Sequence, residues 1–146
     1  MKLKIRDVIT SDKAEILRMI QGLSNESHTE SPLTIRYINK YLSSSCSHIL
    51  LAENEKRVVG LLSYSVRPDL WHAAMCCFIE EIVVDSSERK RGVGAKLLIA
   101  LINRVKKKRY VEVSITVMPK NESAQHLYKR MGINEEVICL EKHYSK

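Results

Sequence analysis

The sequence predicts a single α/β domain, a mixed sheet with helices on its faces, in the order β-α-α-β-β-β-α-β-α-β. Three observations lead to this prediction. The chain has 146 residues, enough for one domain with a substantial core, so we expect one domain over residues 1–146. Its hydrophobic share of 45% and charged share of 28% are typical of folded globular chains. Apolar runs typical of strands alternate along the chain with apolar stripes at helical spacing.

The first part of the chain is predicted to contain one strand and two helices. A strand over residues 3–8 is followed by a helix whose N-cap is Thr10 or Ser11. The apolar stripe of that helix consists of Ile16, Met19, Ile20 and Leu23. The polar stretch over residues 24–32 is predicted to be a loop. A second, shorter helix then carries Ile35, Ile38 and Leu42.

From His48 onward the pattern changes to strands. The segment "HILLAENEKRVVGLLSYSV" contains two apolar runs separated by Asn54-Glu55-Lys56, which is a hairpin signal. A loop with Pro68 and Trp71 follows, and "MCCFIEEIVVD" is then predicted as a third long strand.

The remaining elements alternate between helix and strand. Helical spacing returns with Leu98, Leu101, Ile102 and Val105, and the segment 110–118 alternates as a strand. A last helix carries Ala124, Leu127, Tyr128 and Met131, and residues 133–140 are predicted to form a closing strand.

The segment "ERKRGVGAKLL" lies between a predicted strand and a predicted helix. Amides at the start of a helix are unpaired, and together with the helix dipole they favour an anion. Gly92 and Gly94 allow a ligand to approach the backbone, and Arg89, Lys90 and Arg91 add positive charge. We therefore expect this loop to hold a phosphate or pyrophosphate.

Two familiar phosphate loops do not fit. A P-loop requires Gly-x-x-x-x-Gly-Lys-Ser/Thr, and a dinucleotide fingerprint requires a third Gly at Leu97. The remaining pattern, Arg89-x-x-Gly92-x-Gly94, resembles the acyl-coenzyme A loop of the GNAT family of N-acetyltransferases, Gln/Arg-x-x-Gly-x-Gly/Ala. The segment "NESAQHLYKRMG" is similar to the family's Asn-x-x-Ala-x-x-Leu/Phe-Tyr-x-x-x-Gly block. Many members have Gly where this chain has Lys90, so we expect a stiffer loop.

The resemblance covers residues 48–133 well and the N-terminal helices only by arrangement. It implies a GNAT-like, mostly antiparallel sheet and acetyl-CoA as co-substrate. It also implies that main-chain groups of Val83 and Val84 bind the pantetheine arm and stabilise the oxyanion, where two parallel strands splay. The implied cofactor-binding residues are Val83, Val84, Arg89, Lys90, Arg91, Gly92, Val93, Gly94, Ala95 and Asn121. On its own pattern Asn121 is a helix N-cap, and both roles are compatible.

Acetyl transfer to an amine needs a base, because an alkyl amine with a pKa of about 10 is mostly protonated at neutral pH. Glu80 and Glu81 interrupt an apolar strand, and a two-residue period places them on opposite faces. Without the resemblance, the pattern indicates two ordinary surface carboxylates. The resemblance favours Glu80 as the base, directly or through a water, with Glu81 as the second choice or as a contact to a cationic substrate.

Tyr128 lies on the apolar stripe of the last helix, so its pattern alone indicates a core residue. The resemblance instead gives it the role of the acid that protonates the departing thiolate. For the acceptor, the resemblance directs attention to the loop with Glu26 and Glu30 and to the loop with Trp71. Acidic residues there suit a small cationic amine, such as a polyamine or an amino-acid-like amine.

The net charge and the remaining side chains limit which other functions are expected. The charge of +7 leaves open a basic nucleic-acid-binding module, but the aromatic share of 5% argues against it, and we do not expect nucleic acid as the main partner. A second alternative is a non-catalytic acyl-CoA-binding regulator.

The His and Cys residues lack metal-ligand spacing, so no metal is expected. The absence of a signal peptide or long apolar run favours a cytoplasmic protein without a membrane span. Many members of the family form dimers, so the resemblance also suggests a homodimer.

Overall fold

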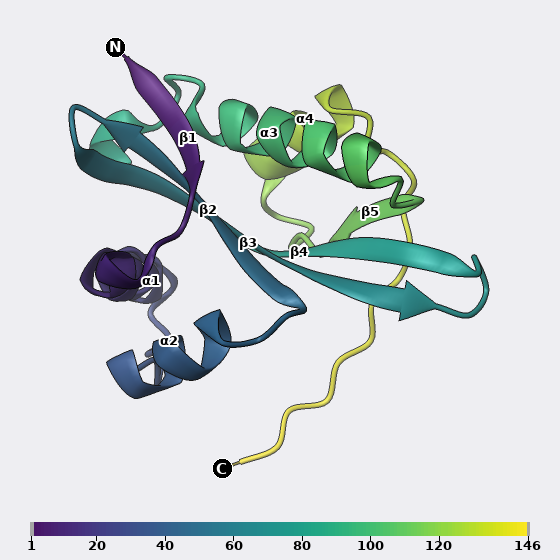
Figure 1. Cartoon of the computed structure of the whole chain (residues 1–146), viewed down its shortest axis with the longest axis horizontal. Helices are drawn as coiled ribbons and strands as arrows, with labels where there is room; N and C mark the ends of the chain where they lie inside the picture. The colour runs from purple at the N-terminus through teal and green to yellow at the C-terminus, as the bar shows by residue number, and fades with distance from the viewer. Residues whose placement is uncertain (1, 146) are drawn as a thin grey trace.

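The computed structural model describes residues 2–145, which form a five-stranded sheet flanked by four α-helices (Figure 1). The strands lie side by side in chain order, and the first four are antiparallel. β5 instead runs parallel to β4, because helix α3 crosses over between them. The strands are β1 (Leu3–Asp7), β2 (Ser47–Asn54), β3 (Arg57–Asp69), β4 (Ala74–Val84) and β5 (Glu112–Ile115). A mixed, mostly antiparallel sheet is therefore confirmed.

The helices cover the two faces of the sheet in pairs. α1 (Lys13–Ser27) and α2 (Ile35–Leu42) pack on one face, and α3 (Val93–Lys108) and α4 (Glu122–Arg130) lie on the other (Figure 1). Each pair encloses its own apolar core: Leu97, Leu98 and Leu101 are central on the α3 side, and Ile16, Met19 and Ile38 on the other. None of the helices in this described part is both long and apolar enough to cross a bilayer.

The start of α1 differs from the prediction. Thr10–Asp12 form a 3-10 turn, and α1 begins only at Lys13. Asp12, rather than Thr10 or Ser11, organises this turn, because its carboxylate accepts a hydrogen bond from the Ile9 amide at 2.8 Å. Arg6 of β1 also donates two hydrogen bonds to that carboxylate, at 2.8 and 2.9 Å, and thereby ties the turn to the sheet.

The predicted hairpin is confirmed, and it closes through Glu55 and Lys56, both with positive φ. The predicted closing strand over residues 133–140 is wrong: this segment is irregular, and Val137, Ile138 and Leu140 are 82–90% exposed. Alternating apolar residues permit a strand, but a strand forms only where a neighbouring strand supplies partners. β5, at the edge of the sheet, is shorter than predicted, and the segment 133–145 runs past it as an extended chain (Figure 1).

Candidate functional site

The two carboxylates in the middle of β4 lie on the same face of the sheet. The register between β3 and β4 shifts between Ser63 and Tyr64, which leaves Glu80 as the extra residue of a β-bulge. The Ser63 hydroxyl donates a hydrogen bond to Glu81, and the Ser65 hydroxyl donates one to Glu80 at 2.7 Å. Ser63 and Ser65 are two residues apart, so they share one face. The prediction that the glutamates face opposite sides is therefore wrong, because a bulge cancels one step of the alternation.

Glu81 is an exposed residue, but neighbouring protein atoms crowd its carboxyl and reduce its hydration. Desolvation raises its pKa above the ordinary value of 4.5, the charge of Glu80 adds to the rise, and the Ser63 hydrogen bond opposes it. The Glu81 amide also donates to the Ser63 oxygen at 3.1 Å, which fixes the two side chains relative to each other. A carboxylate with a raised pKa is a stronger proton acceptor, so Glu81 stays the second choice for the base after Glu80.

Tyr41, which the sequence analysis missed, belongs to the same group. Its hydroxyl, at the end of α2, is buried beside the hydroxyl groups of Ser63 and Ser47. Burial raises the pKa of Tyr41 to about 12, the charges of Glu81 and Glu80 add to the rise, and hydrogen bonding with Ser63 and Ser47 opposes it. Tyr41 follows Ile38 by three residues, so its place on the buried side of α2 could have been found from helical spacing.

Strands β4 and β5 part beside this group. Their parallel pairing runs from Cys76 and Glu112 to Ile79 and Ile115 and then stops, although β4 continues to Val84. The last four residues of β4, which include Val83 and Val84, therefore pair with β3 alone. This gap follows from the bulge at Glu80, since a bulge bends its strand and increases the local twist.

The glycine loop leads from the end of β4 into α3, as predicted. Gly92 caps the helix with φ of 82°, and the first helical hydrogen bond joins the Lys96 amide to the Gly92 carbonyl at 3.0 Å. No side chain caps the amides of the first turn, which belongs to Val93, Gly94 and Ala95. Lys90 also has a positive φ, of 60°, a conformation that glycine adopts without strain. The loop thus presents uncapped amides beside a basic segment.

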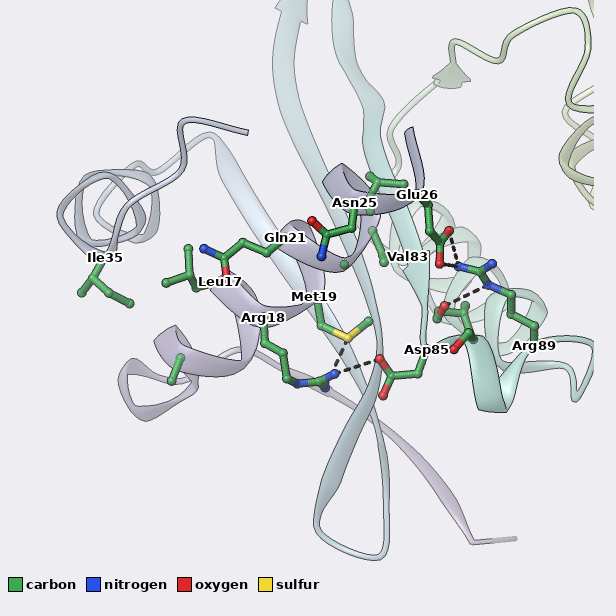
Figure 2. A pocket seen from close by; sticks show the side chains of 15 residues that line it. Leu17, Arg18, Met19, Gln21, Asn25, Glu26, Ile35, Val83, Asp85 and Arg89 are labelled. Carbon is green, nitrogen blue, oxygen red and sulfur yellow. Dashed lines mark hydrogen bonds and ion pairs between the residues drawn. The ribbon is translucent and has the colours of Figure 1, made fainter. Parts of the chain in front are cut away.

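A cavity of about 630 Å³ adjoins this loop (Figure 2). α1 and the beginning of α2 form one wall, and the end of β4 with Arg89 forms the other. Figure 2 shows Glu26 of α1 and Arg89 joined across its rim, where both Glu26 carboxylate oxygens accept hydrogen bonds from Arg89 at 2.7 Å. Arg89 also donates to the Val84 carbonyl at 3.2 Å. A second contact joins the two walls, because Arg18 of α1 donates to Asp85, directly after β4, at 2.9 Å.

Tyr128 and Asn121 lie on α4, on the opposite side of the sheet from α1. Tyr128 is half-buried against the α3 core, and this burial raises the pKa of its phenol. It also lines a second cavity of about 600 Å³ between residues 115–119 and the C-terminal segment. The Asn121 side chain accepts a hydrogen bond from the Ala124 amide at 3.2 Å, so its predicted N-cap role is confirmed.

Other predicted residues are not gathered at this site. Trp71 is 92% exposed in the β3–β4 turn, before β4 begins at Ala74. Glu80 lies six residues further along β4 than Ala74, a distance of about 20 Å, so Trp71 is remote from the glutamates. Glu30 is exposed in the α1–α2 loop, and Arg91 pairs with its neighbour Glu88 at 3.1 Å.

Near Trp71, potential metal ligands of Asp69, His72 and Cys76 lie within 4.8 Å of one another. Asp69 Oδ1 accepts a hydrogen bond from the His72 amide at 3.0 Å and lies 2.8 Å from its Nδ1. These contacts close the turn between Asp69 and His72.

Together, the fold and the site define a class of α/β domain in which a bulged strand parts from its parallel neighbour and then leads into a glycine loop before a helix. Residues 14–133 match the family described as the acetyltransferase (GNAT) family. The chain therefore belongs to the GNAT acetyltransferases, as its motifs suggested.

Similar proteins include diamino-acid acetyltransferases. The chain is 30% identical over 113 residues to the L-2,4-diaminobutyric acid acetyltransferase of Halalkalibacterium halodurans, over 76% of this chain and 56% of that protein. It is 23% identical to the enzyme of the same name from Virgibacillus pantothenticus, over 92% of this chain and 80% of that one. The match thus spans little more than half of the first relative's length.

A solved aminoglycoside acetyltransferase, from an uncultured soil metagenomic sample and in complex with sisomicin, has the same fold. It superimposes with a TM-score of 0.84 at 19% identity, over 99% of this chain and 96% of that one.

Proposed function

We propose that this protein is an acetyl-CoA-dependent N-acetyltransferase that acts on a primary amine of a small cationic molecule. The observation that carries the proposal is the pair Glu80 and Glu81, held on one face of β4 directly before the strand parts from β5. Membership of the GNAT family supplies the reaction class. The acceptor attacks the thioester directly while both substrates are bound, so no acetylated enzyme forms.

The cofactor is proposed to lie along the end of β4 and over the start of α3. Its pyrophosphate would accept hydrogen bonds from the first-turn amides of α3 and from Arg89, with Lys90 and Arg91 adding charge. The pantetheine amides would pair with the free edge at Val83 and Val84, where a main-chain amide also stabilises the oxyanion. Asn121 would contact the pantetheine arm while it caps α4.

Proton transfer is divided between groups on the two sides of the gap where β4 parts from β5. Glu80 takes a proton from the acceptor ammonium, directly or through a water, and Glu81 contacts the cationic amine. The neutral nitrogen then forms a bond to the acetyl carbon as the carbon–sulfur bond breaks, and the thiolate takes a proton from Tyr128. Burial keeps the Tyr128 phenol protonated at neutral pH, as this role requires.

A small cationic amine, polyamine-like or amino-acid-like, is the proposed acceptor. Two curated relatives are named for L-2,4-diaminobutyric acid, and a protein of the same fold is in complex with sisomicin. Proteins similar to this chain are thus associated with molecules that carry amino groups. Glu80 and Glu81 form no ion pair with a described residue of this chain, which leaves their charge available to such a substrate. A cytoplasmic location, a homodimer and a single domain over residues 1–146 stay predictions.

The test measures coenzyme A release from acetyl-CoA with a panel of polyamines, diamino acids, aminoglycosides and amino-terminal peptides. Tyr128→Phe and Glu80→Gln are each expected to lower kcat at least about tenfold for the preferred amine. Tyr144→Phe is the matched control, since Tyr144 is an exposed tyrosine of the C-terminal segment. No turnover with any amine, despite acetyl-CoA binding, would favour a non-catalytic regulator. No acetyl-CoA binding at all would refute the proposal.

A further inference from the structure

Four side chains with metal-binding atoms converge where the β3–β4 turn meets the start of β5. Asp69 ends β3, His72 lies in the turn, Cys76 is near the start of β4, and Glu112 opens β5. Cys76 and Glu112 are partners in the parallel register, so the adjacent strands bring them side by side. The expectation that no metal binds used only the spacing of His and Cys residues, whereas two of these four groups are carboxylates.

The distances among three of these groups suit a tetrahedral metal ion. Ligand atoms of Asp69, His72 and Cys76 all lie within 4.8 Å of one another. His72 Nδ1 is 2.8 Å from Asp69 Oδ1 and 3.8 Å from Cys76 Sγ. Tetrahedral ligands at zinc bond lengths of about 2.0–2.3 Å lie about 3.3–3.8 Å apart. The Cys76 contact already has that spacing, and the Asp69 contact needs to lengthen by only about 0.5 Å.

The surrounding contacts orient these ligand atoms toward one another. Arg67 donates to Asp69 Oδ2 at 3.3 Å, which leaves Oδ1 facing His72. The His72 amide donates to that Oδ1 at 3.0 Å, so the turn and the carboxylate are fixed together. At the other ring nitrogen, Glu112 Oε2 lies 3.8 Å from His72 Nε2. A carboxylate beside the outer nitrogen is the usual partner of a metal-binding histidine, because it keeps the proton there and leaves the inner nitrogen free for the ion.

The burial of Cys76 distinguishes this group from an exposed acidic turn. Cys76 is 2% exposed, whereas the side chains of Asp69 and His72 are 19% and 38% exposed. A buried sulfur together with partly exposed nitrogen and oxygen donors gives an ion both an anchor and an entry path. Thiolate, imidazole and carboxylate are all zinc ligands, whereas Mg²⁺ and Ca²⁺ prefer oxygen donors. The donor set therefore favours zinc.

We propose that Asp69, His72 and Cys76 bind a zinc ion, with water at the fourth position. Binding releases the Cys76 thiol proton to solvent, so the ion is held by a thiolate, a carboxylate and a neutral imidazole whose proton is on Nε2. Glu112 is the positioning residue, since it acts on the ion through His72. The site lies at the start of β4 and the glycine loop follows its end, so this inference is independent of the proposed acetyl transfer.

Zinc titration of the full chain, after removal of metal with EDTA, tests the site. We expect calorimetry to show one zinc ion per chain. At a free zinc concentration about 100-fold above the dissociation constant, the melting temperature should rise by about 5–10 °C. Trp71 is the only tryptophan of the chain and precedes His72, so its fluorescence should change with the same midpoint. Cobalt in place of zinc should give the near-ultraviolet absorption of a cobalt–thiolate bond.

Substitutions assign the ion to these residues. His72→Gln and Cys76→Ala should each weaken zinc binding at least about tenfold, and Glu112→Gln should weaken it about tenfold. His126→Gln and Cys139→Ser are the matched controls, because both residues are exposed and lie outside the group. His72 is in an exposed turn, so His72→Gln keeps the test valid even if the loss of the buried Cys76 side chain unfolds the protein.

The possible results either support or overturn the site. Zinc binding that depends on His72 and Cys76 but not on the two control residues supports it, whether or not acetyl transfer occurs. No zinc binding by the unsubstituted protein would refute the proposal. Equal zinc affinity of the unsubstituted protein and His72→Gln, or cobalt absorption that survives in Cys76→Ala, would place the ion elsewhere and refute it as well.

Discussion

Replacing Glu26 with glutamine is expected to strengthen acetyl-CoA binding. Glu26 holds the Arg89 guanidinium through two hydrogen bonds of 2.7 Å, at the loop where we place the pyrophosphate (Figure 2). The cofactor must therefore compete with Glu26 for Arg89. Glutamine has nearly the same shape but no charge, so it releases Arg89 at a lower cost.

The size of the effect follows from the exposure of the pair. Both side chains are 46% exposed, so water and salt screen their attraction. Exposed ion pairs contribute about 0–1 kcal/mol, and here a single Arg89 nitrogen serves both carboxylate oxygens, so the two-nitrogen fork of the strongest Arg pairs is absent. Release of up to about 1 kcal/mol corresponds to a dissociation constant for acetyl-CoA lower by a factor of up to about 5.

Calorimetric titration with acetyl-CoA at low and high salt measures this change. Glu30→Gln is the control, because Glu30 also lies in the α1 to α2 region, is exposed and forms no ion pair with a described residue, yet its substitution changes the net charge equally. The gain should be specific to Glu26→Gln and should shrink at high salt. Unchanged or weaker binding in Glu26→Gln would show that Glu26 orients Arg89 for the cofactor, and the competition argument would be wrong.

Two further substitutions test packing and electrostatics. Gly60→Ala should destabilise the protein by about 1–3 kcal/mol in urea unfolding, because a Cβ there would lie 2.8 Å from Val93 Cγ1, at the start of α3. Gly22→Ala, where a Cβ meets nothing within 4 Å, should be neutral or stabilising, and equal losses in both variants would contradict the packing argument. Glu81→Gln should raise the melting temperature more at neutral pH than at acidic pH. The folded-state pKa of Glu81 is raised, so its ionisation lowers stability as the pH rises from 4.5 through that higher pKa, and glutamine does not ionise. A melting difference independent of pH would refute this reasoning.

Elements with strong local patterns could be predicted from the sequence. The hairpin at Asn54-Glu55-Lys56 and the start of α3 after Gly92 follow from turn chemistry and apolar spacing, which depend on neighbouring residues. The segment 133–140 has an equally suggestive pattern but forms no strand. Its outcome depends on a pairing partner elsewhere in the fold, and a local pattern carries no information about that partner.

For the candidate site, the sequence indicated residue types but not their arrangement. Glu80 and Glu81 as the acidic pair, and the glycine loop as the anion-binding segment, stay predictions. Their relation to the rest of the site was not foreseen. Glu26 was expected to contact the acceptor, but it pairs with Arg89 across 63 positions of the chain. Tyr41 was missed because nothing in its sequence neighbourhood shows that it lies near the two glutamates.

The sequence by itself determined the mixed α/β class, the succession of helices and hairpins, and the positively charged glycine loop, because each depends on residues within one turn or strand. Only the tertiary structure decided that β4 bulges at Glu80, that both glutamates share a face, and that Tyr41 faces them from α2. The physical reason is that the direction of a strand side chain depends on its register with a neighbouring strand. That register is set by the packing of the whole sheet, so one extra residue in β4 was enough to bring the two carboxylates together.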